Sequence, residues 1–135
     1  MQIKDKEGNI RIELTEFKKQ FDDEPIFINI NVLIRMDNLT AKEEIFVELS
    51  DLEELEKHLR KLNDTLNHTF YFQHIDEQFQ IKFEPENNGG IEITGFLTDK
   101  LYVNTTNFSF KMPSAEIPYL IKQTQNTIIE LNALK

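Results

Sequence analysis

Apolar and polar residues alternate at every second position through most of this chain, and this alternation constrains the fold more than any other feature. The longest alternating segment covers residues 26–36, where Ile28, Ile30 and Val32 lie in one row and Asn29 lies in the other. A period of two places successive side chains on opposite faces of a β-strand, and β-branched residues pack well there. The segment predicts a half-buried strand, and the chain as a whole predicts a fold dominated by β-sheet.

The same alternation predicts further strands at residues 10–14, 44–49, 69–75, 79–83, 91–97 and 108–112. The Asp-Asn-Leu-Thr sequence at 37–40 is typical of a turn and predicts an antiparallel hairpin. The Asn-Asn-Gly-Gly sequence at 87–90 indicates a tight turn, because Asn and Gly accept the positive φ that such turns require. Gly95 lies inside a predicted strand, which indicates a bulge or a close approach by a neighbouring residue.

Two segments change to a helical period. The apolar stripe of the first helix consists of Leu52, Leu55, Leu59, Leu62 and Leu66. Ser50 and Glu53 have the spacing of a capping box and predict where this helix begins. The second helix is predicted to begin near Ser114, with Pro118 in its first turn. Its apolar stripe consists of Ile117, Leu120, Ile121, Thr124, Ile128 and Leu131.

The order of elements is strands, helix, more strands and a second helix, which predicts an α+β fold in one domain spanning residues 1–135. We expect a mainly antiparallel sheet of about six or seven strands, with the two amphipathic helices packed on it. Residues 46–50 before the first helix correspond in spacing to residues 110–114 before the second. This correspondence indicates an internal structural duplication.

No residue pattern in the sequence indicates catalysis or metal binding. The chain has no cysteine, which excludes disulfides, zinc-thiolate sites and a cysteine nucleophile. Its three histidines, His58, His68 and His74, do not have the spacing of a metal site. No glycine-rich phosphate loop, dinucleotide-binding fingerprint or nucleophile elbow occurs. We therefore predict a protein that is not an enzyme and that needs no cofactor or metal.

The N-terminal residues are charged and contain no apolar stretch of signal-peptide length. No part of the chain approaches the roughly 18–20 consecutive apolar residues that a membrane span requires. We expect a cytoplasmic protein that does not associate with membranes.

Acidic residues exceed basic ones by 24 to 15, giving a formal net charge of −9. Such a charge repels nucleic acid and speeds encounter with a basic partner. The densest acidic stretch runs from Asp37 to Glu56, with eight acids and one base, Lys42. The acids predicted to contact a partner are Glu43, Glu44, Glu48, Glu53, Glu54 and Glu56.

The order of these segments resembles the WapI-type immunity proteins, a family of small bacterial proteins encoded beside contact-dependent toxins. The resemblance covers residues 27–131. It rests on strand 46–49 leading into the leucine-striped helix, on the aromatic strand Phe70-Tyr71-Phe72, on segments 79–83 and 90–97, and on the helix entered through Ile117-Pro118-Tyr119-Leu120. The resemblance implies a non-enzymatic inhibitor that binds the toxic C-terminal domain of a cognate effector, often a nuclease.

Three functions are compatible with the sequence. The first is an immunity protein whose acidic surface neutralises a basic toxin domain. The second is a protein-binding or structural module of a bacterium or mobile element with no link to a toxin; a large secreted toxin gene next to this one would favour the first over the second. The third is a ligand-binding domain or unrecognised hydrolase, which would need a deep pocket lined by converging polar groups. The oligomeric state stays open.

Overall fold

The computed structural model of the chain describes residues 1–20, 23–74 and 76–133. In chain order its elements are β1 (Gln2–Lys4), β2 (Ile10–Lys19), β3 (Phe27–Met36), β4 (Leu39–Glu48), α1 (Leu49–Thr65), β5 (Phe70–Gln73), β6 (Phe79–Pro85), β7 (Gly90–Thr98), β8 (Thr105–Pro113), the short 3-10 helix η1 (Ser114–Glu116) and α2 (Ile117–Ala133). Each predicted strand and both predicted helices are present, although residue 75, at the end of one predicted strand, lies outside the described residues.

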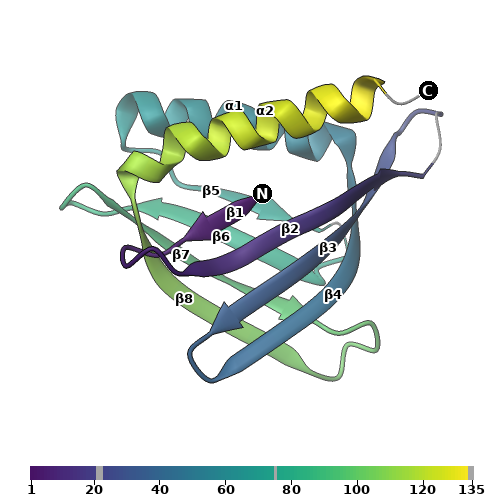
Figure 1. Cartoon of the computed structure of the whole chain (residues 1–135), viewed down its shortest axis with the longest axis horizontal. Coiled ribbons are helices and arrows are strands. Elements are labelled where there is room, and N and C mark those ends of the chain that lie inside the picture. The colour runs from purple at the N-terminus through teal and green to yellow at the C-terminus, as the bar shows by residue number, and fades with distance from the viewer. Residues whose placement is uncertain (21–22, 75, 134–135) are drawn as a thin grey trace.

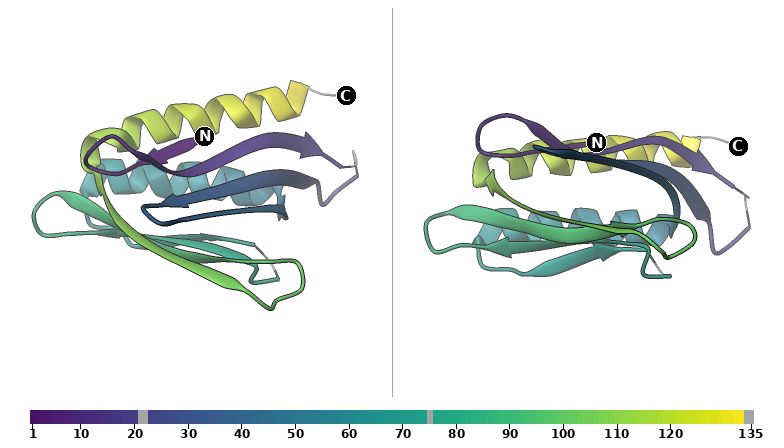
Figure 2. Two further views of the ribbon diagram at one scale, coloured as in Figure 1. Left: turned by 60° about the horizontal axis from the view of Figure 1, so that its bottom comes forward. Right: turned by 90° about the horizontal axis from the view of Figure 1, so that it is seen from below.

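The strands form two antiparallel sheets of four strands each, sheet A in the order β1-β2-β3-β4 and sheet B in the order β5-β6-β7-β8. The mainly antiparallel α+β fold is therefore confirmed, with eight strands in two sheets where about six or seven strands were predicted. Strand β1 was missed because its three residues are too few to show a period. Figure 2 shows the two sheets as separate layers. Each meander leads into a helix, so the order ββββα occurs twice, as the predicted duplication requires.

The core lies between the inward rows of the two sheets and the apolar stripes of the helices. In sheet A, Ile28 pairs with Val47 and Ile30 with Ile45. In sheet B, the ring of Phe83 stacks on Phe70 with 4.6 Å between centroids. The buried side chains of this core include Ile28, Ile30, Val32, Val47, Leu55, Leu59, Leu62, Phe72, Ile81, Phe83, Ile93, Phe110, Leu120 and Ile121.

The two helices lie side by side at the same end of both sheets (Figure 1), and each contacts the sheet of the other repeat. From α1, the ring of His58 stacks on Phe70 of sheet B at 5.0 Å. From α2, the side-chain oxygen of Gln123 accepts a hydrogen bond from the amide of Gln2 in sheet A at 2.9 Å. The helix of each repeat is therefore joined to the sheet of the other repeat. Among the described residues, no helix is both long enough and apolar enough to cross a membrane.

Helix α1 differs from the prediction at both ends. It begins at Leu49, directly after the last residue of β4. Its capping box joins Glu48 to Asp51 rather than Ser50 to Glu53. The Asp51 carboxylate accepts the Glu48 amide at 2.8 Å. At the other end, Leu66 is 44 % exposed, because it adopts a left-handed conformation with φ 50° at the C-cap and leaves the buried stripe.

Two glycines have the roles that their positions predicted. Gly89 has φ +87° in the turn between β6 and β7, a conformation that residues with a side chain rarely adopt. Gly95 pairs with Ile81 on one side and Phe108 on the other. A β-carbon at Gly95 would lie 1.9 Å from the Gln80 carbonyl oxygen, so this position has no room for a side chain.

Candidate functional site

The outward face of β4 carries Glu44, Phe46 and Glu48, which alternate with the buried Ile45 and Val47. Because β4 is an edge strand of sheet A, one side of this row has no neighbouring strand. Phe46 is 44 % exposed and lies between the two glutamates on the same face. We name these three residues the β4 outer row. An exposed aromatic ring between two carboxylates suits contact with a protein that presents both apolar and basic groups.

The β4 outer row continues onto β3. Across the strand pair, Phe27 lies opposite Glu48 and Asn31 lies opposite Glu44. Phe27 is partly buried and adds a second aromatic side chain to this face. Asn31 donates a hydrogen bond to the Glu16 carboxylate of β2. The outer face of sheet A therefore combines aromatic and polar groups around the two predicted glutamates.

Glu43 does not share this face. It pairs with Val32 and lies in the inward row of β4 with Ile45 and Val47, near the end of the row, where it is partly exposed. Both Glu43 and Glu44 are predicted to contact a partner, but they point to opposite faces of β4, because consecutive residues of a strand do so. Phe46 was missed as a surface residue, although the alternation placed it in the same row as Glu44.

The three acids of α1 lie on two sides of the helix. Glu53 and Glu56 line a hollow of about 180 Å³ that also contacts Ile128 of α2. Glu54 lines another hollow of about 180 Å³, together with Tyr71 of β5. The predicted acids thus occupy the outer face of β4, the inward row of β4 and both flanks of α1.

Several of these acids already have partners within the chain. Glu54 forms an ion pair with Lys57 at 3.4 Å, and Glu56 forms one with Arg60 at 3.0 Å. Glu48 belongs to the capping box of α1. In the part of the chain that the structure describes, Glu44 and Glu53 are exposed and form no ion pair. These two carboxylates are the freest to meet a basic group of another molecule.

Two of the histidines pack against aromatic rings. His58 Nδ1 and His68 Nε2 lie 2.8 Å apart, and both rings stack near Phe70. Burial lowers the pKa of His68, and the nearby charges of Lys61 and His58 lower it further. Over residues 1–20, 23–74 and 76–133, no group of three or more His, Cys, Asp or Glu side chains has an arrangement that could hold a metal ion.

The third histidine, His74, is buried directly after strand β5. His74 is 6 % exposed, and its Nδ1 accepts a hydrogen bond from the Asp76 amide at 3.3 Å. Its carbonyl accepts the Glu77 amide at 3.0 Å. Burial lowers the pKa of His74, while the charges of Asp76 and Asp51 oppose that change. The neutral imidazole therefore organises the connection between β5 and β6.

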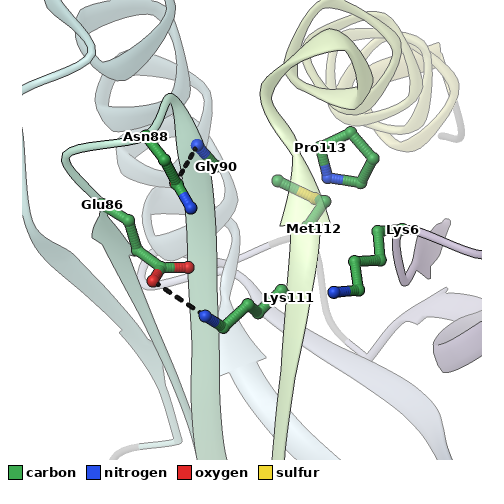
Figure 3. A pocket seen from close by; sticks show the side chains of 7 residues that line it. All are labelled: Lys6, Glu86, Asn88, Gly90, Lys111, Met112 and Pro113. Atoms are coloured by element: carbon green, nitrogen blue, oxygen red, sulfur yellow. Dashed lines mark hydrogen bonds and ion pairs between the residues drawn. The ribbon is translucent and has the colours of Figure 1, made fainter.

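A third hollow, of about 220 Å³, lies beside β8 (Figure 3). The Lys111 ammonium contacts the Glu86 carboxylate at 3.1 Å. Figure 3 shows Lys6 on the opposite side of β8 from this ion pair. The residues that line this hollow are Lys6, Glu86, Asn88, Gly90, Lys111, Met112 and Pro113. The hollow is smaller than the roughly 300–1,000 Å³ typical of small-molecule pockets.

The chain is similar to one family of proteins and to one solved structure. A family model described as the Immunity protein WapI-like family matches residues 1–131. A solved structure described as that of the plant transcriptional regulator PBF-2 has 14 % sequence identity and a TM-score of 0.49, over 92 % of this chain and 80 % of that chain. No curated protein matches the chain.

Proposed function

Because the chain belongs to the WapI-like immunity protein family, we propose that it binds a cognate bacterial toxin domain and blocks its activity. The observation that carries this proposal is the family match, which extends over residues 1–131 of 135. An immunity protein of this kind acts by occupying a surface, so it needs no reacting group of its own.

The charge of the chain supports a basic partner. A net charge of −9 attracts a positively charged domain from a distance and raises the rate of encounter. The toxin domain that we propose is a nuclease, whose phosphate-binding surface would be basic. The same charge disfavours binding of nucleic acid by the chain itself. The proposed site of action is the cytoplasm of the bacterium that makes both proteins.

The β4 outer row supports direct contact with such a surface. Phe46 offers an exposed aromatic ring, and Glu44 offers an exposed carboxylate that forms no ion pair within the described chain. Aromatic residues are enriched where partners bury surface together, and complementary charges around them add specificity and association rate. In the proposed complex, Glu43, Glu53, Glu54 and Glu56 lie around this contact and contribute to the electric field more than to close packing.

The decisive experiment uses the C-terminal toxin domain encoded by the gene beside this one. Expression of that domain should stop bacterial growth, and co-expression of the chain should restore it. The purified proteins should form a complex that survives gel filtration. If the two proteins neither form a complex nor restore growth, the toxin-neutralising function is wrong.

A titration separates binding from catalysis. A binding inhibitor removes toxin activity in proportion to its amount and reaches full inhibition near one equivalent of chain per toxin domain. An enzyme that inactivated the toxin would act at far lower ratios and more completely with time. Inhibition that progresses with time at about one hundredth of an equivalent would contradict the proposed mode of action.

A further inference from the structure

The loop between β7 and β8, residues 99–104, exposes three consecutive large apolar side chains. Leu101 is 81 % exposed, Tyr102 is 55 % exposed and Val103 is 72 % exposed. Leu101 and Val103 are the two most exposed of the chain's large hydrophobic residues among those that the structure describes. Figure 1 shows this loop at the end of sheet B that is remote from both helices. Contiguous exposed apolar groups on a small protein mark an interaction site more often than scattered ones do.

The first repeat shows that the fold does not need this loop. Its equivalent turn connects Met36 of β3 to Leu39 of β4 through two residues, 37 and 38. In the second repeat, the connection from Thr98 to Thr105 takes six residues, 99–104. The four additional residues, six minus two, make room for the exposed apolar segment. A hairpin of the same kind can therefore close without Leu101 or Val103.

The Asp99 side chain and the loop backbone together hold the loop in one shape. The Asp99 amide donates to the Asn104 carbonyl and the Tyr102 amide donates to the Asp99 carbonyl, both at 3.0 Å. Asp99 accepts the Val103 amide at 3.0 Å, the Asn104 amide at 3.1 Å and the Asn104 side-chain amide at 3.0 Å. The hydrogen bond from the Val103 amide lowers the pKa of Asp99, and the Asn104 groups lower it further, while desolvation opposes them. The carboxylate is therefore charged at neutral pH. These bonds hold the apolar side chains outward before any partner arrives, which reduces the entropy lost on binding.

Tyr102 ties the loop to its neighbour. Its backbone has φ 56°, a conformation that is rare for a bulky residue, and its hydroxyl donates to the Asp76 carbonyl at 3.0 Å. Asp76 and Glu77 are exposed in the adjacent β5–β6 connection. The described residues of the β5–β6 and β7–β8 connections thus include three acids, with Asp99 as the third, and one base, Lys100. The apolar segment is therefore bordered by net negative charge.

Building on the proposed function, we infer that the β7–β8 loop is the apolar anchor of the toxin complex. Leu101 and Val103 enter an apolar depression on the toxin domain, and Asp76 and Glu77 meet basic groups at its rim. Rigid apolar side chains that become fully buried contribute most of the affinity of many interfaces, whereas charges at the rim contribute association rate and specificity.

The test compares three forms of the full chain by their Kd for the toxin domain encoded by the neighbouring gene. The double variant Leu101→Asp/Val103→Asp should bind at least about thirtyfold more weakly, as expected for the loss of a hot spot. The control is Leu39→Asp, because Leu39 is 49 % exposed beside the equivalent turn of the first repeat. This control should bind like the unmodified chain. All three forms should melt at closely similar temperatures, because the replaced side chains are exposed.

The negative charge of the introduced aspartates helps to interpret a change in Kd. Each introduced aspartate adds a negative charge, which by itself would favour a basic partner. Weaker binding by the double variant therefore reports lost apolar contact. In a further variant, Asp99→Ala, the apolar side chains remain but the three hydrogen bonds that the Asp99 carboxylate accepts are lost. Kd should rise by about tenfold, because the loosened loop must be ordered on binding.

Four results would overturn the inference. If the unmodified chain binds the toxin domain and the double variant binds it equally well, the loop lies outside the interface while the proposed function stands. If the unmodified chain does not bind the toxin domain, both proposals fail together. If Leu39→Asp weakens binding as much as the double variant does, the effect is not specific to this loop. If gel filtration without toxin shows a dimer that the double variant abolishes, the loop binds a second copy of the chain instead.

Discussion

At the scale of single residues, Gly95 of sheet B has no room for a side chain. A β-carbon there would lie 1.9 Å from the Gln80 carbonyl oxygen and 2.7 Å from a carbon of the Phe108 ring. The Gln80 backbone cannot move away without disturbing the pairing of β6 with β7. The position is therefore fixed by backbone packing rather than by a turn.

We predict that Gly95→Ala destabilises the protein by about 3 kcal/mol or more, at the upper end of the cost of overpacking a core. Chemical denaturation followed by circular dichroism measures this loss. Gly90→Ala is the matched control in the same strand, because its β-carbon would come no closer than 3.3 Å to any neighbour, a side-chain oxygen of Asn88. A loss below about 1 kcal/mol for Gly95→Ala would contradict the close approach.

Asp5 is a second residue with a large local effect. It is 8 % exposed, and its carboxylate accepts the amides of Glu7 and Asn9, both at 2.9 Å, and the Arg11 guanidinium at 2.8 Å. Burial opposes ionisation, but the Asn9, Arg11 and Glu7 hydrogen bonds together lower the pKa of Asp5. The carboxylate thus closes the connection between β1 and β2.

This lowered pKa predicts a pH dependence. The stability that ionised Asp5 contributes is fully present above the unfolded value of about 3.9 and is lost as the pH falls through the lower folded value. Asp5→Asn should cost about 1–3 kcal/mol at pH 7 and should flatten the loss of stability below about pH 4. Denaturation at pH 7 and pH 3 measures both effects. An equal cost at both pH values would show that the Asp5 charge is not involved.

At the scale of elements, the start of α1 could be capped in two ways, and the structure uses one of them. The sequence contains Ser50 with Glu53, whereas the structure uses Glu48 with Asp51. The choice depends on where β4 ends, since Val47 and Ile45 must stay in the inward row while Leu49 turns into the helix.

We predict that Asp51→Ala destabilises the protein by about 0.5–2 kcal/mol, because the Glu48 amide loses its acceptor at the helix start. Glu53→Ala should change stability by less than about 0.5 kcal/mol, as expected for an exposed position. Thermal or urea unfolding of both variants decides between the two patterns. A larger loss for Glu53→Ala would place the cap where the sequence suggested.

The outer row of β4 gives a prediction about association. Glu44→Lys should slow association with a basic toxin domain severalfold at low salt, and high salt should shrink the difference, because screening acts on exposed charges. Changing Glu48 as well should slow association at least tenfold but should also lower the melting temperature, since Glu48 caps α1. Stopped-flow mixing at two ionic strengths measures the rates. Glu130→Lys on α2 is a control with the same change in net charge, and an equal slowing by this control would remove Glu44 from the interface.

At the scale of the whole molecule, the crosswise contacts between the repeats determine how the chain unfolds. His58 of the first repeat stacks on Phe70 of the second, and Gln123 of the second bonds to Gln2 of the first. The inward side chains of each sheet are also buried partly by side chains of the other repeat. We therefore expect residues 1–135 to behave as one cooperative unit.

The prediction is that fragments 1–66 and 67–135, made separately, do not fold, because each would expose a row of buried side chains. The full chain should show one unfolding transition, with coincident curves from circular dichroism and from tyrosine fluorescence. Mixed fragments should regain part of the native circular dichroism. A cooperative transition in either isolated fragment would show that the repeats are independent domains.

Local periodicity was enough to identify most elements and the core. Alternation separated Ile45 and Val47 from Glu44, the leucine spacing placed Leu59 in the core, and an isolated glycine in a strand marked the close approach at Gly95. These features follow from backbone geometry within a few residues. The same alternation also places Phe46 in the outward row with Glu44. We interpreted Phe46 only as part of a strand and did not predict that it is exposed.

Only the tertiary structure decided how those elements are combined. Strands with similar apolar rows can pair in several ways, and the division into two sheets depends on contacts between residues far apart in the chain. The separation of Glu54 from Glu44 also needed the folded arrangement, as did the exposure of Leu101. The reason is physical: hydrophobic burial is non-directional, so local pattern determines which face of an element is buried, while long-range packing determines what covers it.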